Sequence, residues 1–199
     1  MVAFDNTILS LLIFPDADLR HGSDAQEVEY ARERVLGLVK ELEDAREQVV
    51  IPAPALSELL VTDGVDVQDV LTKLRSSSFL RIESFDERAA VELVMRLREA
   101  RKAGDQREGL PITKTAMKFD RQIVAIALVN GANVLYSDDE GVAKFAASCG
   151  LDVKRVIDLP VPASQQAFQF SEAGAQAATA AEPPLTKLPK PNAVDEESA

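Results

Sequence analysis

FDRQIVAIALVNGANVLYSDDEGVAKFAASCGLDV, residues 119–153, is the stretch of sequence that decides the fold. Its first part has apolar residues at spacings of three and four, which predicts a helix over 115–130 that Gly131 ends. The apolar run at 133–137 predicts a strand, and 140–148 predicts a second helix. A helix, a strand and a helix in this order are typical of a sheet that helices cover.

The same alternation extends to both sides of this stretch. Further strands are predicted over 2–4, 49–51, 79–85 and 152–159. Further helices are predicted over 7–14, 23–48, 55–61, 67–74 and 86–103, with Ser23 as the cap of the long polar one. Strands separated by helices imply an α/β fold, with a central, mainly parallel sheet and helices on both faces. In such sheets, ligands bind beyond the carboxyl ends of the strands.

The composition divides the chain into two parts. Residues 1–160 carry the alternation of strands and helices and form the predicted globular domain. Residues 161–199 are rich in Ala, Pro and Gln and poor in residues that build a core, so we expect a partly disordered tail. No apolar run approaches the roughly 20 residues that cross a bilayer, and the first residues lack the basic leader of a signal peptide. We therefore expect a cytoplasmic protein with no membrane association.

The residue counts restrict the chemistry. The chain has one histidine, His21, and one cysteine, Cys149, which follows a helical apolar pattern and is predicted to be a buried structural thiol. A zinc site of several His or Cys ligands is excluded, and a Ser-His-Asp enzyme would depend on a histidine with no nucleophile motif nearby. The net charge of −11 argues against passive attraction to nucleic acid. Acidic side chains that bind divalent cations would nevertheless make a neutral or positive site.

Acidic side chains stand where the predicted sheet would bind a ligand. Asp5 directly follows the first strand, and the pair Asp138 and Asp139 follows the strand at 133–137. Glu58 interrupts a short apolar helix. Because the carboxyl ends of parallel strands share one edge of a sheet, these acids and those of adjoining helices could converge there.

Asp120 has the strongest physical argument of its own. It shares a helical stripe with Ile123, Val124 and Ala127, so its carboxylate lies on the face that meets the core. Burying an unpaired carboxylate costs several kcal/mol, which calls for a cation. The alternative to a metal ion is a salt bridge to a nearby basic residue. The candidates are Lys114, Lys118 and Arg121.

The other acids also have simpler interpretations. Asp5 could cap the helix that follows it, and Glu58 could be a solvated surface residue. One member of the pair at 138–139 could cap the next helix, while the other ligates. A set of carboxylates without histidine suits hard cations, so the expected cofactor is Mg²⁺ or Mn²⁺. Two such ions could activate a water and stabilise the leaving oxygen of a phosphodiester.

Three segments together resemble the PIN-domain family of metal-dependent ribonucleases, which includes the VapC-type toxins of bacterial toxin–antitoxin pairs. They are VAFDNTILSLLI at 2–13, IPAPALSELLV at 51–61 and the opening stretch at 119–153. The resemblance implies a three-layer α/β/α sandwich that binds Mg²⁺ or Mn²⁺ and hydrolyses RNA as an endoribonuclease. It also implies candidate partners besides RNA, namely an antitoxin or another protein, and a second copy of the chain.

The resemblance also implies roles for individual residues. Four acids match the family's metal-binding and catalytic set, namely Asp5, Glu58, Asp120 and Asp139. The fourth comes from a Ser/Thr-x-Asp motif, Ser137-Asp138-Asp139, in which Asp138 is a substitute ligand. Thr7 and Ser137 would orient the ligands by hydrogen bonds.

Two other functions remain open from the sequence. A PIN fold without catalysis could serve as a scaffold or binding module in a larger assembly. A phosphatase of the acid-rich, doubly wound kind fits less well, since it would place a second Asp two residues after Asp5, where this chain has Thr7.

Overall fold

The centre of the sheet is the short strand β1 (Val2–Phe4), whose three residues are all apolar and buried. The computed structural model describes residues 1–21, 26–102 and 116–162. In this part of the chain, five strands form one sheet in the order β5-β4-β1-β6-β7, and every pairing is parallel. The other four are β4 (Val49–Pro52), β5 (Leu80–Glu83), β6 (Val134–Tyr136) and β7 (Asp152–Lys154).

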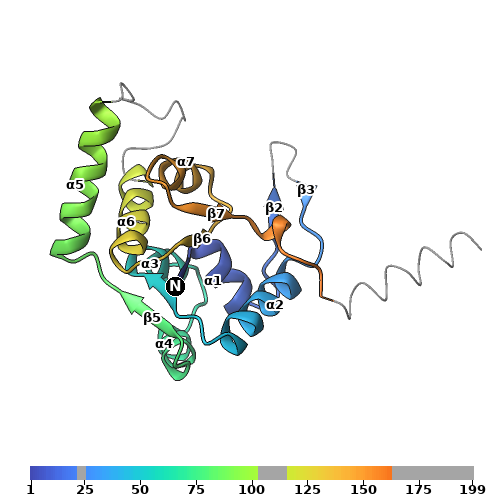
Figure 1. The fold of residues 1–199 in the computed structure, drawn as a ribbon. Helices are drawn as coiled ribbons and strands as arrows, with labels where there is room; N and C mark the ends of the chain where they lie inside the picture. The colour runs from blue at the N-terminus through green and yellow to red at the C-terminus, as the bar shows by residue number, and fades with distance from the viewer. Residues whose placement is uncertain (22–25, 103–115, 163–199) are drawn as a thin grey trace, which may run out of the picture. The chain divides into compact units, whose positions relative to one another are not determined.

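Helices flank this sheet on both faces, so the predicted three-layer α/β/α arrangement is confirmed (Figure 1). The connections from β1 through β4 to β5 contain α1 (Asn6–Ile13), α2 (Ala31–Asp44), α3 (Ala53–Leu60) and α4 (Val67–Ser76). The return from β5 through β6 to β7 contains α5 (Glu87–Lys102), α6 (Ala116–Val129) and α7 (Glu140–Ser148). The chain first runs from β1 outward to β5 and then returns past β1 to β6 and β7. Because crossovers between parallel strands are right-handed, this reversal places the later helices on the opposite face of the sheet from the earlier ones.

Helix α6 contributes much of the core, as its apolar stripe predicts. Ile123, Val124 and Ala127 are each at most 1% exposed. The helix ends as expected at Gly131, which has a φ of +76°, a conformation that glycine adopts without strain. The next residue, Ala132, donates its N–H to the carbonyl of Ala127 at 3.0 Å and so closes the end of the helix. Cys149 is buried, as predicted.

The prediction of one long helix over 23–48 is wrong. Residues Gln26–Glu27 instead form a strand, β3, which pairs antiparallel with β2 (Arg20–His21). Helix α2 begins only at Ala31, after Tyr30 in a left-handed conformation, and Ser23 lies outside the described residues. The buried stripe of α2 begins at Ala31, and no apolar periodicity holds the earlier polar residues in a helix.

The last strand is also shorter than the predicted 152–159. β7 ends at Lys154, and Val156–Asp158 form a single turn of 3-10 helix. This turn is held by side chains, because Asp158 accepts the N–H of Arg155 at 3.2 Å and Asp138 accepts the N–H of Val156 at 3.0 Å. Backbone N–H groups that donate to carboxylates in this way are not available for hydrogen bonds to a neighbouring strand, so β7 ends before them.

Residues Met1–Pro162 form one structural unit. The predicted tail begins at residue 161, and from residue 163 onward it lies outside the described residues. Within the described ranges, no helix is both long enough and apolar enough to span a bilayer.

Candidate functional site

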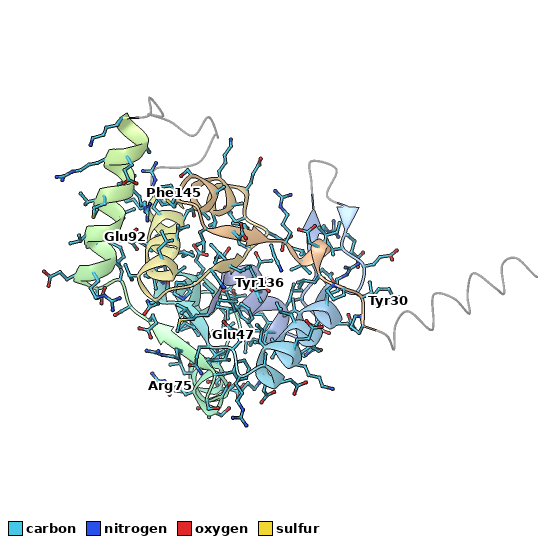
Figure 2. All side chains as sticks on the ribbon, viewed as in Figure 1. Tyr30, Glu47, Arg75, Glu92, Tyr136 and Phe145 are labelled. Atoms are coloured by element: carbon cyan, nitrogen blue, oxygen red, sulfur yellow. The ribbon has the colours of Figure 1, made fainter. Side chains whose placement is uncertain are left out.

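Asp5 and Ser137 lie side by side because they follow two neighbouring strands. Phe4 at the end of β1 is in register with Tyr136 at the end of β6, and Asp5 donates its N–H to the Tyr136 carbonyl at 3.1 Å. Tyr136 is labelled in Figure 2. The Ser137 hydroxyl donates to Asp5 Oδ2 at 2.6 Å, and the two residues are 0% and 3% exposed. They are the two buried polar residues of the described chain.

The carboxylate of Asp5 is not used as a helix cap. Asp5 occupies the N-cap position of α1, but its side chain makes no helix-capping hydrogen bond. Burial raises the pKa of Asp5 from 3.8 to about 6, although the hydrogen bonds from Ser137 and from the Asn6 backbone oppose this rise. The charges of Asp139 and Asp138 raise it further. The ionised form of this carboxylate is therefore costly in the folded chain.

Glu58 on α3 is affected by the charges of the other candidate acids. Burial and the charges of other carboxylates raise its pKa from 4.5 to about 7. The contributing carboxylates are Asp5, Asp120 and Asp139. Glu58 as a whole residue is exposed. The raised pKa of Glu58 thus indicates that three acids from other parts of the chain lie within electrostatic reach of it.

Asp120 is partly buried near the start of α6. Of the three basic residues predicted as its alternative partners, Lys118 is exposed and Lys114 lies outside the described residues. The Arg121 guanidinium lies 5.6 Å from the centre of the Phe145 ring on α7, a cation–π contact that joins α6 to α7. Phe145 is labelled in Figure 2.

Asp138 and Asp139 differ in what they contact. Asp139 Oδ1 accepts the N–H of Val142 at 2.8 Å and so caps α7. Asp138 Oδ2 accepts the N–H of Val156, the first residue of the 3-10 turn after β7. Only Asp139 of this pair contributes to the raised pKa of Glu58. Both aspartates nevertheless contribute to the raised pKa of Asp5, so the two differ in their contacts and in their effect on Glu58.

Ser137 links two of the acids. Its hydroxyl donates to Asp5 and accepts the N–H of Asp139 at 3.1 Å. Thr7, for which an orienting role was also predicted, makes no hydrogen bond to Asp5 in the described part of the chain. The sequence did not predict which acid would accept the Ser137 hydrogen bond. The pattern that could have predicted it is that Asp5 and Ser137 each follow the last apolar residue of a strand, and these two strands are paired in register.

The types of ligand in this set of acids suit a metal ion, but their present positions do not form a binding group. Four carboxylates offer only hard oxygen ligands, which suits Mg²⁺ or Mn²⁺ and not zinc. As the described side chains are placed, however, no three acidic, His or Cys residues form a group that could hold an ion. Ion binding would therefore require some of these carboxylates to move closer together, while a hydrogen bond from Ser137 holds Asp5. The oxygen ligands of these residues suit the ion, and ion binding would have to bring the carboxylates together.

Comparison with known proteins adds a likeness to solved structures. No protein-family model matches the chain, and no curated protein matches it. Among solved structures, the chain is similar to one described as the crystal structure of DNA-bound VapBC from Salmonella typhimurium. The TM-score is 0.45 and the identity 15%, over 78% of this chain and 99% of that chain. At this level of similarity, neither family nor function follows from the match.

Proposed function

We propose that this chain is a PIN-like ribonuclease that depends on Mg²⁺ or Mn²⁺ and hydrolyses RNA phosphodiesters. The observation that supports the proposal is the raised pKa of Glu58, to which three other acids contribute. Mutual repulsion among carboxylates destabilises a fold unless a bound cation neutralises their charge, and it is retained where the site has a function. A divalent ion at the carboxyl edge of the sheet would neutralise the charge and would also give the site a function.

The chain's own residues would divide the work. Ser137 holds one oxygen of Asp5, which leaves the other oxygen to ligate. Asp139 uses Oδ1 to cap α7, and its second oxygen would ligate. Glu58 and Asp120 would close the set from α3 and α6. When bound, the ions would activate a water and stabilise the leaving oxygen.

That RNA is the substrate is the more specific part of the proposal. It is supported by the resemblance of three sequence segments to PIN ribonucleases, as is the proposal that the chain is the toxin of a toxin–antitoxin pair in the cytoplasm. An antitoxin would then be its protein partner. With a net charge of −11, the chain needs its bound cations to attract a polyanion.

The test combines metal binding with cleavage. Calorimetry with Mn²⁺ is expected to detect binding to the full chain and none to Asp120→Asn, while cleavage of single-stranded RNA stops in that variant and in EDTA. The matched control is Asp152→Asn, the same change at an exposed acid on the opposite end of the strands. Cleavage by Asp120→Asn at the wild-type rate would sink the proposal.

A catalytically silent scaffold is the second candidate. It is favoured by the absence of a ready metal group among the described side chains. In that case, calorimetry finds no Mn²⁺ binding at millimolar concentration, and RNA remains intact with either metal. The acids would then serve no metal, and replacing Asp5 or Glu58 by its amide would stabilise the protein by removing a repelled charge.

A further inference from the structure

The Arg34 side chain of α2 binds the part of the chain that follows β7. Its Nη1 donates to the carbonyl of Ile157 at 3.1 Å and to the carbonyl of Leu159. Its Nε donates to the carbonyl of Glu29 at 3.0 Å, which fixes the guanidinium at the start of its own helix. The carbonyls of Ile157 and Leu159 lie 123 and 125 positions beyond Arg34 in the chain. One side chain thus joins α2 to the 3-10 turn and to the residue that follows the turn.

The same segment packs closely on α2. Gly37 lies one helical turn after Arg34, and a Cβ atom added to it would stand 3.7 Å from Cγ of Pro162. Val156 and Leu159 are 0% and 6% exposed, so apolar burial also holds the segment in place. Figure 1 shows the chain after β7, in orange, turning toward α2. The 3-10 turn therefore has a fixed position relative to α2, and the hydrogen bonds of Arg34 define its backbone.

On its other side, the 3-10 turn holds one of the acids. Val156 donates its N–H to Asp138 Oδ2 at 3.0 Å. Asp138 stands between Ser137, which donates to Asp5, and Asp139, whose N–H donates to the Ser137 hydroxyl at 3.1 Å. The segment 137–139 is thus bound to the turn on one side and to Asp5 on the other.

We propose that Arg34 is a positioning residue for the acidic site. It holds the 3-10 turn against α2, and the turn holds Asp138 through the N–H of Val156. The segment 137–139 is thereby fixed beside Asp5. Arg34 bonds to backbone carbonyls and acts on the acids through this turn. The part of this inference that concerns a metal ion rests on the proposed function.

The value of such a link follows from the state of the acids. As the described side chains are placed, they form no ready group for an ion, so ion binding has to bring carboxylates together. Groups that must be ordered at the moment of binding lower the affinity. A segment 137–139 that is already held leaves fewer groups to order. Residues that orient metal ligands in this way typically change metal affinity by about 10–100-fold when they are replaced.

Calorimetry with Mn²⁺ on the full chain tests the effect on the site. Arg34→Met removes the donors and keeps an unbranched side chain, and it should weaken Mn²⁺ binding about tenfold. Arg34→Lys keeps one donor group and should bind more tightly than Arg34→Met. The matched control is Arg88→Met, because Arg88 on α5 also donates to a distant backbone carbonyl, that of Val129. Val129 is the last residue of α6, whereas Asp120 lies near its start, so the control should bind Mn²⁺ as the wild type does.

Amide hydrogen exchange tests the same link without a metal. In the metal-free chain, the N–H groups of Val156 and Asp139 should exchange about tenfold faster in Arg34→Met than in the wild type, and at the wild-type rate in Arg88→Met. A disturbance confined to the 3-10 turn would change the exchange of Val156 and leave that of Asp139 unchanged. The amide of Asp139 is therefore the decisive measurement.

A double substitution tests whether both effects pass through one hydrogen bond. Val156→Pro removes the N–H that Asp138 accepts, at the first residue of a helical turn, where proline is tolerated. Adding Arg34→Met to Val156→Pro should weaken Mn²⁺ binding no further, because both changes break the same link.

The possible results separate this inference from the proposed function. Unchanged exchange of the Asp139 amide in Arg34→Met, additive effects of the two substitutions, or wild-type Mn²⁺ affinity in Arg34→Met would each overturn the positioning role. If the wild type itself binds no Mn²⁺, the proposed function fails, and the exchange of Asp139 alone then decides whether Arg34 positions the segment.

Discussion

Replacing Asp5 with asparagine should stabilise the metal-free protein, and the gain should grow with pH. Asp5 is 3% exposed, and its pKa rises from 3.8 to about 6 on folding. Between these two values the folded state binds more protons than the unfolded state, so the contribution of Asp5 to stability falls as pH rises through this window. Above pH 6 the ionised carboxylate costs the fold about 3 kcal/mol.

The magnitude can be followed in solution. An amide at position 5 keeps an acceptor for the Ser137 hydroxyl and removes the charge. About 1.5 kcal/mol of the cost develops between pH 5 and 8, which corresponds to a difference in Tm of about 3–6 °C for a domain of this size. Thermal unfolding in EDTA, monitored by circular dichroism, should therefore show Asp5→Asn gaining on the wild type across this range.

Two comparisons make the experiment decisive. Asp152→Asn, at an exposed acid, should show no such gain with pH. With saturating Mn²⁺ the order should reverse, because the wild type gains stability from the bound ion and Asp5→Asn does not. If Asp5→Asn is destabilised at pH 8 in EDTA, or if its advantage does not change with pH, then burial of an ionised Asp5 is not a cost and the reasoning fails.

Other changes at the acidic site have distinct expected outcomes. Ser137→Ala should lower stability by about 1–3 kcal/mol in urea unfolding, because it removes the 2.6 Å hydrogen bond to a buried carboxylate, whereas Ser148→Ala at the exposed end of α7 should cost less. Mn²⁺ affinity measured by calorimetry should rise as pH passes the Glu58 pKa of about 7, because the metal displaces a proton there; a flat profile would exclude Glu58 as a ligand. Asp139→Asn should keep the cap of α7 and lose metal binding, while Asp139→Ala should lose both, at an added cost of about 1 kcal/mol in thermal unfolding; equal stability of the two variants would refute the capping role.

The layers of the fold were predictable because hydrophobic periodicity is local. The stripe of α6 and the glycine that ends it can be read from about fifteen consecutive residues, and the structure keeps both. The start of α2 could not be read in this way. Residues Gln26–Glu27 pair with Arg20–His21, and no local pattern in a polar segment distinguishes such a pairing from a helix.

The acids illustrate the same limit at the scale of the site. The sequence predicted that Asp5 and the pair after β6 lie at one edge, and register confirms that Asp5 and Ser137 are neighbours. The sequence could not show that Asp138 and Asp139 have different hydrogen-bond partners. Asp138 accepts the N–H of Val156, which lies 18 positions further along the chain, and Asp139 does not. Their metal-binding roles stay predictions.

The position of β1 in the middle of the sheet sets the time at which the site can exist. β1 is synthesised first, but its neighbour β6 begins at Val134, and the turn that binds Asp138 includes Val156. A chain emerging from the ribosome therefore carries Asp5 for most of its synthesis without Ser137 to hold it. Contacts so distant in sequence form late and slowly. The acidic group is thus completed only when nearly all of the described unit has been made, so any function that needs the whole group must wait until then.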